Sequence, residues 1–144
     1  MTTDAGDATL PVDGGCLCGQ IQYRGEIDPQ KIAVCHCTDC QVNSASAFGV
    51  VAHLEEFELI TGTLKTWEKI AESGTRRALA FCGDCGTRIY AKAVDGSAGF
   101  WGLRVGTCNQ RRDLAPRMQV WCDSRLPWVA MLDGTVEFPR QPQL

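Results

Sequence analysis

Seven of the nine cysteines stand in three short groups whose spacing suits metal binding. The groups are Cys16 with Cys18, then Cys35 with Cys37 and Cys40, then Cys82 with Cys85. Cysteines that served only as small buried hydrophobic residues would be scattered along the chain. We call the first and third groups together the quartet and the middle group the trio. We expect zinc at both, with the quartet closed and the trio open to a substrate.

The number of cysteines and the absence of a recognisable export signal favour zinc over a disulfide framework. Nine cysteines are an odd number, and residues 1–7 lack the basic start and apolar run of a secretory signal. Disulfides are disfavoured in a reducing cytoplasm, where grouped thiols more often hold metal or do chemistry. We therefore expect a cytoplasmic zinc protein.

The quartet has the spacing of a structural site. In tetrahedral zinc each sulfur lies about 2.3 Å from the metal, which puts neighbouring sulfurs about 3.8 Å apart. Gly19 and Gly86 follow the last cysteine of each pair, where a positive φ would let backbone N–H groups face the sulfurs. Four thiolates around one zinc carry a net charge of about −2, which is costly to bury without such donors.

The trio combines a one-residue gap with a two-residue gap and can supply three ligands of one tetrahedron. A catalytic zinc keeps three protein ligands and leaves the fourth position to water or substrate. Three thiolates make the metal a weak Lewis acid toward carbonyls, but they leave it able to hold an incoming thiol as the nucleophilic thiolate. The trio therefore points to thiol chemistry.

A fourth protein ligand would close the trio and make it purely structural. The candidates are Cys108, Cys122, His36 and His53. Cys108 is the strongest because it lies in a Gly-Thr-Cys-Asn loop, whereas His36 should point away if its segment is extended. Cys122 fits a small strand residue better than a ligand.

Length and charge limit the remaining possibilities. A chain of 144 residues is most simply one domain, which we place at residues 14–138 between a disordered lead at 1–13 and a tail at 139–144. A net charge of −3 argues against a nucleic-acid-binding surface. No apolar run reaches the roughly 18 residues that a membrane span needs. The sequence does not indicate the oligomeric state.

Short strands must position the quartet and the trio. Polar and apolar alternation and Gly-rich turns predict strands at residues 20–24, 31–34, 47–52, 57–60, 64–67, 75–81, 88–92, 100–105 and 118–121. We expect residues 25–29 to break the first strand, and residues 41–46 to form a helical turn or loop. Strands 57–60 and 64–67 should form a hairpin. The pattern indicates a mostly β domain.

The three groups and their flanks resemble the glutathione-dependent formaldehyde-activating enzyme family, which is related to centromere protein V. The likeness is carried by residues 15–19, 35–40 and 81–87, and it extends from about residue 14 to residue 128. The resemblance implies a β-tent (Mss4-like) fold of small antiparallel sheets organised by a four-cysteine zinc site at the quartet. It also implies a second zinc, linked to activity, at the trio.

The family's named reaction joins formaldehyde to glutathione as S-(hydroxymethyl)glutathione and is classed as a carbon–sulfur lyase reaction. The resemblance thus implies a small thiol and a small aldehyde as partners, with zinc holding the thiol sulfur beside the aldehyde. The alternative is a non-catalytic, zinc-stabilised binding module or thiol-adduct carrier.

Glutathione carries two carboxylates, so a site for it needs cationic groups. Arg104 is the better candidate because it alternates with aromatic and apolar residues in its strand, and Asn109 in the Gly-Thr loop is the second. Arg76 and Arg77 are expected on a solvated strand face. Gln41 stands where many relatives carry Arg, and Gln119 occupies a frequent His position, which leaves the identity of the thiol and the aldehyde open.

Overall fold

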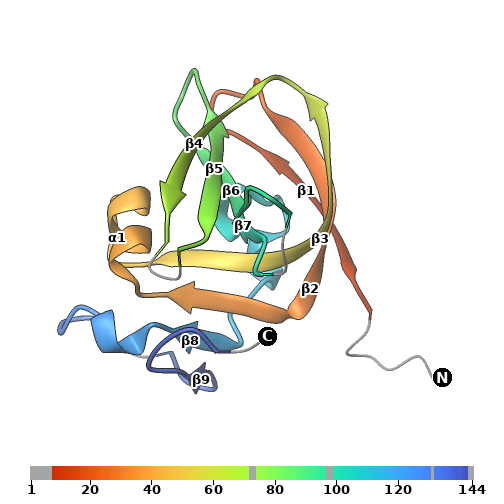
Figure 1. Ribbon diagram of the computed structural model, residues 1–144. Helices are drawn as coiled ribbons and strands as arrows, with labels where there is room; N and C mark the ends of the chain where they lie inside the picture. The colour runs from red at the N-terminus through yellow and green to blue at the C-terminus, as the bar shows by residue number, and fades with distance from the viewer. Residues whose placement is uncertain (1–7, 72–73, 97–98, 131, 143–144) are drawn as a thin grey trace.

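Strands are the main regular elements of the computed structural model, which describes residues 8–71, 74–96, 99–130 and 132–142 (Figure 1). The strands are β1 (Leu10–Gly15), β2 (Gln22–Cys35), β3 (Gly49–Thr61), β4 (Leu64–Ile70), β5 (Arg76–Cys82), β6 (Arg88–Ala93), β7 (Gly102–Arg104), β8 (Met118–Val120) and β9 (Val136–Glu137). The helices are α1 (Thr38–Ser44) and the 3-10 turns η2 (Val105–Thr107), η3 (Arg111–Asp113) and η4 (Cys122–Ser124). Within the described ranges, no helix combines the length and apolar composition needed to cross a bilayer.

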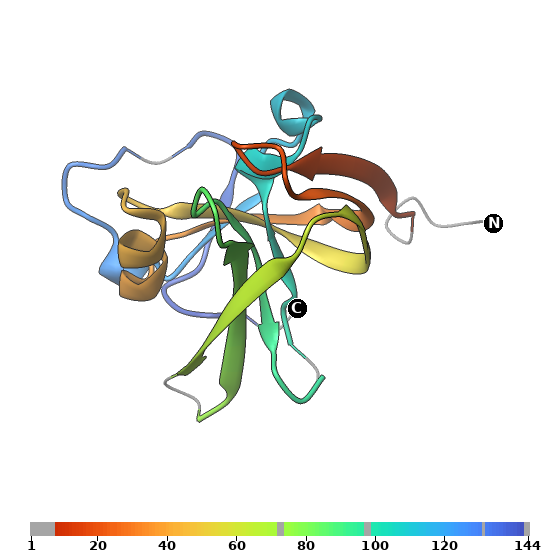
Figure 2. The same cartoon turned by 90° about the horizontal axis from the view of Figure 1, so that it is seen from above.

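Hydrogen bonds join the strands in the order β4-β5-β6-β7-β3-β2-β8-β9, with β1 on the free edge of the first half of β2. The pairs are antiparallel except β2 with β8 and β8 with β9, which are parallel. In Figure 2 the β4–β5 pair projects away from the long β2–β3 pair. This arrangement confirms the mostly β, β-tent (Mss4-like) fold.

Two clusters of buried side chains lie within the described residues. The larger cluster includes Tyr23, Ile89 and Leu103, and the quartet cysteines Cys16, Cys82 and Cys85 belong to it or pack against it. The smaller cluster is built from the ends of β2 and β8 and includes Cys35, and the other two trio cysteines pack against it. Each group of cysteines is therefore seated in its own part of the core.

The expected boundaries of the domain need correction at both ends. Residues 10–13 belong to strand β1 rather than to a disordered lead, because Val12 is buried and the strand pairs with β2 from Leu10↔Ile27 to Gly15↔Gln22. Residues 1–7 lie outside the described part of the chain. In the expected tail, the carbonyls of residues 139 and 140 accept hydrogen bonds from residues 123 and 121, so these two residues join the fold. Residues 143–144 also lie outside the described part.

Strand β2 runs through the predicted break at residues 25–29. Its pairing with β3 shifts register between Glu26 and Ile27 and again between Asp28 and Ile32. A β-bulge of this kind leaves residues unpaired, so Pro29, which has no N–H, is accommodated without ending the strand.

The predicted hairpin between residues 57–60 and 64–67 is wrong. Strand β3 begins at Gly49 and continues through Glu55 and Glu56, and its partners are β2 and β7. Strand β4 pairs with β5 instead. Gly62, with φ of +91°, turns the chain between the two strands, and an added Cβ there would lie 2.2 Å from the Gln20 carbonyl oxygen. The turn is therefore a corner between two parts of the sheet.

Helix α1 begins three residues earlier than the expected turn and carries part of the trio. Cys37 is its N-cap and accepts a hydrogen bond from the Cys40 N–H, while Ala45 ends it with φ of +52°. Left-handed backbone costs a residue with a Cβ roughly 1–2 kcal/mol. Ala45 is exposed, so no burial of its methyl group offsets that cost.

Replacing Ala45 with glycine is expected to stabilise the protein. Glycine adopts a positive φ without steric cost, although its greater freedom in the unfolded chain cancels roughly 0.5–1 kcal/mol of the gain. We expect a net gain of about 0.5–1 kcal/mol in the free energy of unfolding, measured by urea denaturation. Ala47→Gly is the matched control, since Ala47 has no positive φ, and it should bring no gain. Equal effects of the two substitutions would contradict this account of the helix end.

Candidate metal centres

The quartet is assembled from two turns that are far apart in the sequence. Cys16 and Cys18 lie in the turn between β1 and β2, while Cys82 ends β5 and Cys85 lies in the turn that leads to β6. The Cys16 and Cys18 sulfurs are 3.6 Å apart, and the Cys18 and Cys82 sulfurs are 3.7 Å apart. All four sulfurs lie within 4.8 Å of one another. These separations match the sulfur spacing of about 3.8 Å in tetrahedral zinc, so the quartet fits the metal.

Polar hydrogens surround the quartet sulfurs and compensate their negative charge. Cys82 accepts from the backbone N–H groups of Asp84 and Cys85 and from the Gln20 side-chain amide, each at 3.4 Å. The N–H of Ile21 donates to the Cys16 sulfur at 3.2 Å. Such donors stabilise thiolates that are bound to a metal.

Gly19 and Gly86 have φ of +86° and +81°, which confirms the predicted positive values. Their own N–H groups donate to the carbonyls of Cys16 and Cys82, respectively, rather than to sulfur. The two glycines thus close the turns, while the neighbouring residues supply the donors to sulfur. The Thr87 hydroxyl and backbone donate to Cys85 and lower its pKa to about 5.

The trio comes from the end of β2 and the start of α1. Cys35 is the last residue of the strand, Cys37 caps the helix, and Cys40 lies in its first turn. The Cys35 thiol donates to the Cys37 sulfur at 3.4 Å, and the three sulfurs lie within 4.8 Å of one another. Hydrogen bonds from Cys35 and Cys40 lower the pKa of Cys37 to about 3, and the same bonding raises the pKa of Cys35. Three sulfurs at this spacing fit one zinc ion.

The two cysteines considered as a fourth ligand are engaged elsewhere. Cys108 is buried in the larger core cluster, with its sulfur 3.4 Å from the Tyr23 hydroxyl. The Cys122 thiol donates to the Gln119 carbonyl at 3.6 Å. Among the residues that the structure describes, the trio's group of mutually close ligand atoms contains no fourth member.

The two histidines also point to other partners. The His36 Nε2 lies 2.8 Å from the Gln119 Oε1, and its ring is fully buried against Phe48. His53 lies 3.4 Å from a Glu55 carboxylate oxygen and accepts from the backbone N–H of Trp101. None of the four candidates is therefore placed among the mutually close ligand atoms of the trio.

Arg104 is brought to the trio, as expected of a substrate-binding candidate. Its Nη1 lies 3.9 Å from the Cys40 sulfur, and its Nη2 donates to the Asn43 Oδ1 at 3.3 Å. Gly49 leaves room for it, since an added Cβ there would lie 2.7 Å from the Nη1. Lys69 on β4 forms an ion pair with Asp39 of α1, a contact that the sequence pattern did not reveal.

The two neighbouring arginines on β5 behave differently from each other. Arg76 is exposed and pairs with Glu68, as a solvated strand face predicts. Arg77 is half-buried, and its guanidinium donates to the carbonyls of Ala91 and Phe100 at 3.2 and 2.8 Å, so the solvated placement is wrong for this residue. Arg77 shares its strand face with Leu79 and Phe81, and this alternation was the signal available in the sequence.

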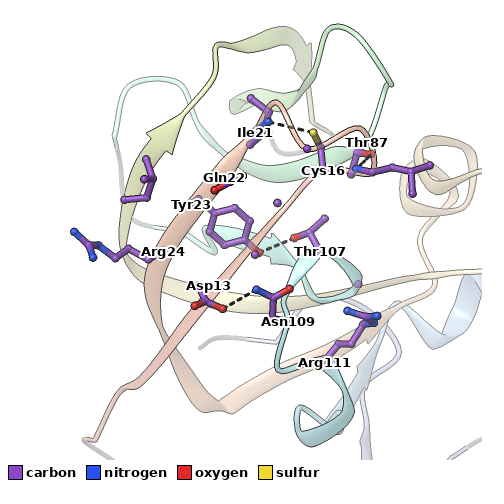
Figure 3. A pocket seen from close by; sticks show the side chains of 16 residues that line it. Asp13, Cys16, Ile21, Gln22, Tyr23, Arg24, Thr87, Thr107, Asn109 and Arg111 are labelled. Atoms are coloured by element: carbon purple, nitrogen blue, oxygen red, sulfur yellow. Dashed lines mark hydrogen bonds between the residues drawn. The ribbon is translucent and has the colours of Figure 1, made fainter.

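Asn109 lies on the quartet's side of the molecule, in a cleft of about 810 Å³ (Figure 3). Its amide donates to Asp13 at 2.9 Å, and this bond together with one from Gln110 lowers the pKa of Asp13. Cys16 lines the cleft, and the Tyr23 hydroxyl lies 2.7 Å from the Thr107 hydroxyl within it. The trio cysteines are not among the described residues that line this cleft, so Asn109 is not placed as a contact for a substrate at the trio.

Comparison with known proteins agrees with this fold. The family model for glutathione-dependent formaldehyde-activating enzymes matches residues 11–124. An uncharacterized lyase of Schizosaccharomyces pombe is 27% identical over 84 residues, which make up 58% of this chain and 59% of the length of that relative. A crystal structure of a Rhodobacter sphaeroides protein shares the fold, with a TM-score of 0.51 at 19% identity over 88% of this chain and 98% of that chain. Since the family model covers most of its length, the chain belongs to the glutathione-dependent formaldehyde-activating enzyme family.

Proposed function

We propose that the protein is a zinc-dependent, carbon–sulfur lyase-type enzyme that adds a small thiol to formaldehyde or a related small aldehyde. Glutathione or a similar thiol would be the co-substrate, as in S-(hydroxymethyl)glutathione synthesis. The observation that carries this proposal is the trio, whose three sulfurs are mutually close while the four candidate fourth ligands have other partners. Membership of the family supports it.

The two groups of cysteines would have different roles. The quartet would hold a structural zinc, and Cys35, Cys37 and Cys40 would hold the second zinc beside the reacting molecules. When bound there, zinc would supply a position that keeps a thiol ionised at neutral pH. In the reaction the thiolate sulfur forms a bond to the aldehyde carbon, and the carbonyl oxygen takes up a proton in place of the one that the thiol lost.

The protein's own groups would stabilise this arrangement. The Arg104 guanidinium, 3.9 Å from the Cys40 sulfur, offsets the negative charge that gathers when thiolates meet at the trio. The Cys40 N–H donates to the Cys37 sulfur at 3.3 Å and fixes its orientation. Holding the thiol and the aldehyde side by side would supply much of the rate acceleration.

We propose the cytoplasm as the location and small molecules as the partners. Free thiols stay reduced there, which suits both the cysteine groups and a thiol substrate. The net charge of −3 gives no electrostatic support for binding nucleic acid.

Metal counting tests the proposal directly. We expect two zinc ions per chain, measured by elemental analysis of the purified protein. A chelator should remove one of them rapidly, together with turnover of thiol and formaldehyde, while the circular dichroism spectrum stays unchanged. This is expected because the trio offers three ligands and the quartet four.

The same measurement separates the enzyme from the alternative. One zinc per chain that leaves only on unfolding, with no thiol binding, would indicate a zinc-stabilised binding module. Two zinc ions with thiol binding but no aldehyde turnover would indicate a carrier of thiol adducts.

A further inference from the structure

Three cationic side chains lie on one face of the sheet formed by β4, β5, β6 and β7. Lys69 and Arg77 are directly opposite each other in the antiparallel β4–β5 pair, so they project from the same face. Leu79, Ala91 and Gly102 form one row across β5, β6 and β7.

Arg77 lies two residues before the β5 member of this row, and Arg104 lies two residues after the β7 member. Because side chains alternate between the two faces of a strand, Arg77 and Arg104 also share a face. Lys69, Arg77 and Arg104 together form what we call the cationic face.

The cationic face looks toward the trio. The Arg104 guanidinium lies 3.9 Å from the Cys40 sulfur. Lys69 forms an ion pair with Asp39, the residue that precedes Cys40 on α1. Helix α1 lies beside β4 in Figure 1, in agreement with the Lys69 contact. A molecule whose sulfur reached the trio would therefore lie within range of these cations.

The three cations differ in what balances their charge. Lys69 has the Asp39 carboxylate, and Arg104 has the trio sulfurs. The Arg77 guanidinium donates to two backbone carbonyls, and no carboxylate among the described residues pairs with it. Burial and the like charge of Arg104 lower the pKa of Arg77, while Cys40 opposes that change.

Placing Arg77 opposite Lys69 and near Arg104 costs stability, since like charges on facing strands repel. A half-buried guanidinium in this position is a strong binding group for an anion, because its planar fork matches a carboxylate with two charge-assisted hydrogen bonds. Both hydrogen bonds to the backbone carbonyls come from the Arg77 Nη2, so an anionic ligand would relieve the repulsion and accept from the remaining guanidinium nitrogens.

We propose that Arg77 is a specificity-determining residue that binds a carboxylate of the thiol substrate while the substrate's sulfur is held at the trio. The inference rests on the proposed function, since the sulfur's position at the trio is what brings the carboxylate to Arg77. Arg77 would thereby favour thiols that carry an acidic group over neutral thiols of similar size.

Binding of the thiol without aldehyde tests the inference without relying on turnover. Glutathione alone keeps both the sulfur that the trio would hold and its carboxylates, and its dimethyl ester lacks the acidic groups. Calorimetry on the zinc-loaded protein should show that Arg77→Gln weakens binding of the acid about 10- to 100-fold, the range expected for losing hydrogen bonds to a charged group. Binding of the diester should change less than twofold.

Arg76→Gln is the matched control, because Arg76 is the neighbouring residue and its side chain is exposed on the opposite face. It should leave the affinity for both compounds unchanged. Arg77→Lys, which keeps the charge but loses the fork, should weaken binding of the acid by less than Arg77→Gln does. Should Arg77→Gln fail to fold, Arg77→Lys and Lys69→Gln replace it in the test. Each should weaken binding of the acid and leave binding of the diester unchanged.

Equal effects of Arg77→Gln on the acid and the diester would overturn the inference, as would unchanged binding of the acid. Turnover of 2-mercaptoethanol with formaldehyde by the unsubstituted protein tests the proposed function separately, because this thiol has no carboxylate. Turnover of the neutral thiol, together with unchanged binding of the acid by Arg77→Gln, would remove the role of Arg77 while leaving the proposed reaction in place.

Discussion

Replacing Cys82 with serine is expected to abolish folded, soluble protein. Cys82 is buried, and its sulfur accepts three hydrogen bonds as well as belonging to the quartet. A structural zinc site contributes about 10–16 kcal/mol in small zinc domains, whereas a whole domain is stable by only about 5–15 kcal/mol. Losing one ligand should therefore remove most of the stability. Soluble yield, zinc content and thermal unfolding measure the effect.

The control for this variant is Cys122→Ser. Cys122 lies outside both groups, and its thiol donates to the Gln119 carbonyl. The Cys122 variant should be soluble and keep both zinc ions. A soluble Cys82→Ser protein with an unchanged melting temperature would show that the quartet does not hold a structural metal.

Cys37→Ser should give a folded protein that has lost the second zinc and all turnover above background. Cys37 is the N-cap of α1, and its sulfur accepts the Cys40 N–H at 3.3 Å. Serine is among the preferred N-cap residues, so the helix keeps its cap while the thiolate ligand disappears. Zinc content should fall by one ion per chain, and the melting temperature should change by only a few degrees, corresponding to about 1–2 kcal/mol.

Two results would contradict this expectation for Cys37. A variant that fails to fold would make the trio a second structural site rather than a reactive one. A variant that keeps two zinc ions and full turnover would place the chemistry elsewhere in the molecule. Cys122→Ser, with one thiol removed outside the trio, again provides the comparison.

Cysteine spacing predicted that the sulfurs of each group would lie close together, as they do, because ligands close in sequence can reach one small sphere whatever the surrounding fold. The cations near the trio were harder to predict. Arg104 was identified from its strand, but Arg77 was assigned to a solvated strand face, since arginine is most often exposed. Its alternation with Leu79 and Phe81 could have indicated partial burial, but its carbonyl partners depend on the pairing of β5 with β6 and on the position of Phe100.

The strands themselves were largely predictable, and their connections were not. Residues 88–92 and 118–121 were predicted as strands, and they correspond to β6 and β8. Glycine and proline at residues 25–29 look the same in sequence whether they end a strand or produce a bulge. Strand β1 was missed because Val12 is its only buried residue, so its position is decided by pairing with β2.

Sequence separation gives the two cysteine groups different histories during protein synthesis. The trio lies within residues 35–40, whereas Cys18 and Cys82 of the quartet are separated by 64 positions. Closing a long loop costs more entropy than closing a short one, and nearby thiols of an unfolded chain can already bind metal. We expect the nascent chain to capture its first zinc at residues 35–40. The second ion can bind only after the β5–β6 turn has emerged from the ribosome and met the β1–β2 turn, so its binding would report that this long-range contact has formed.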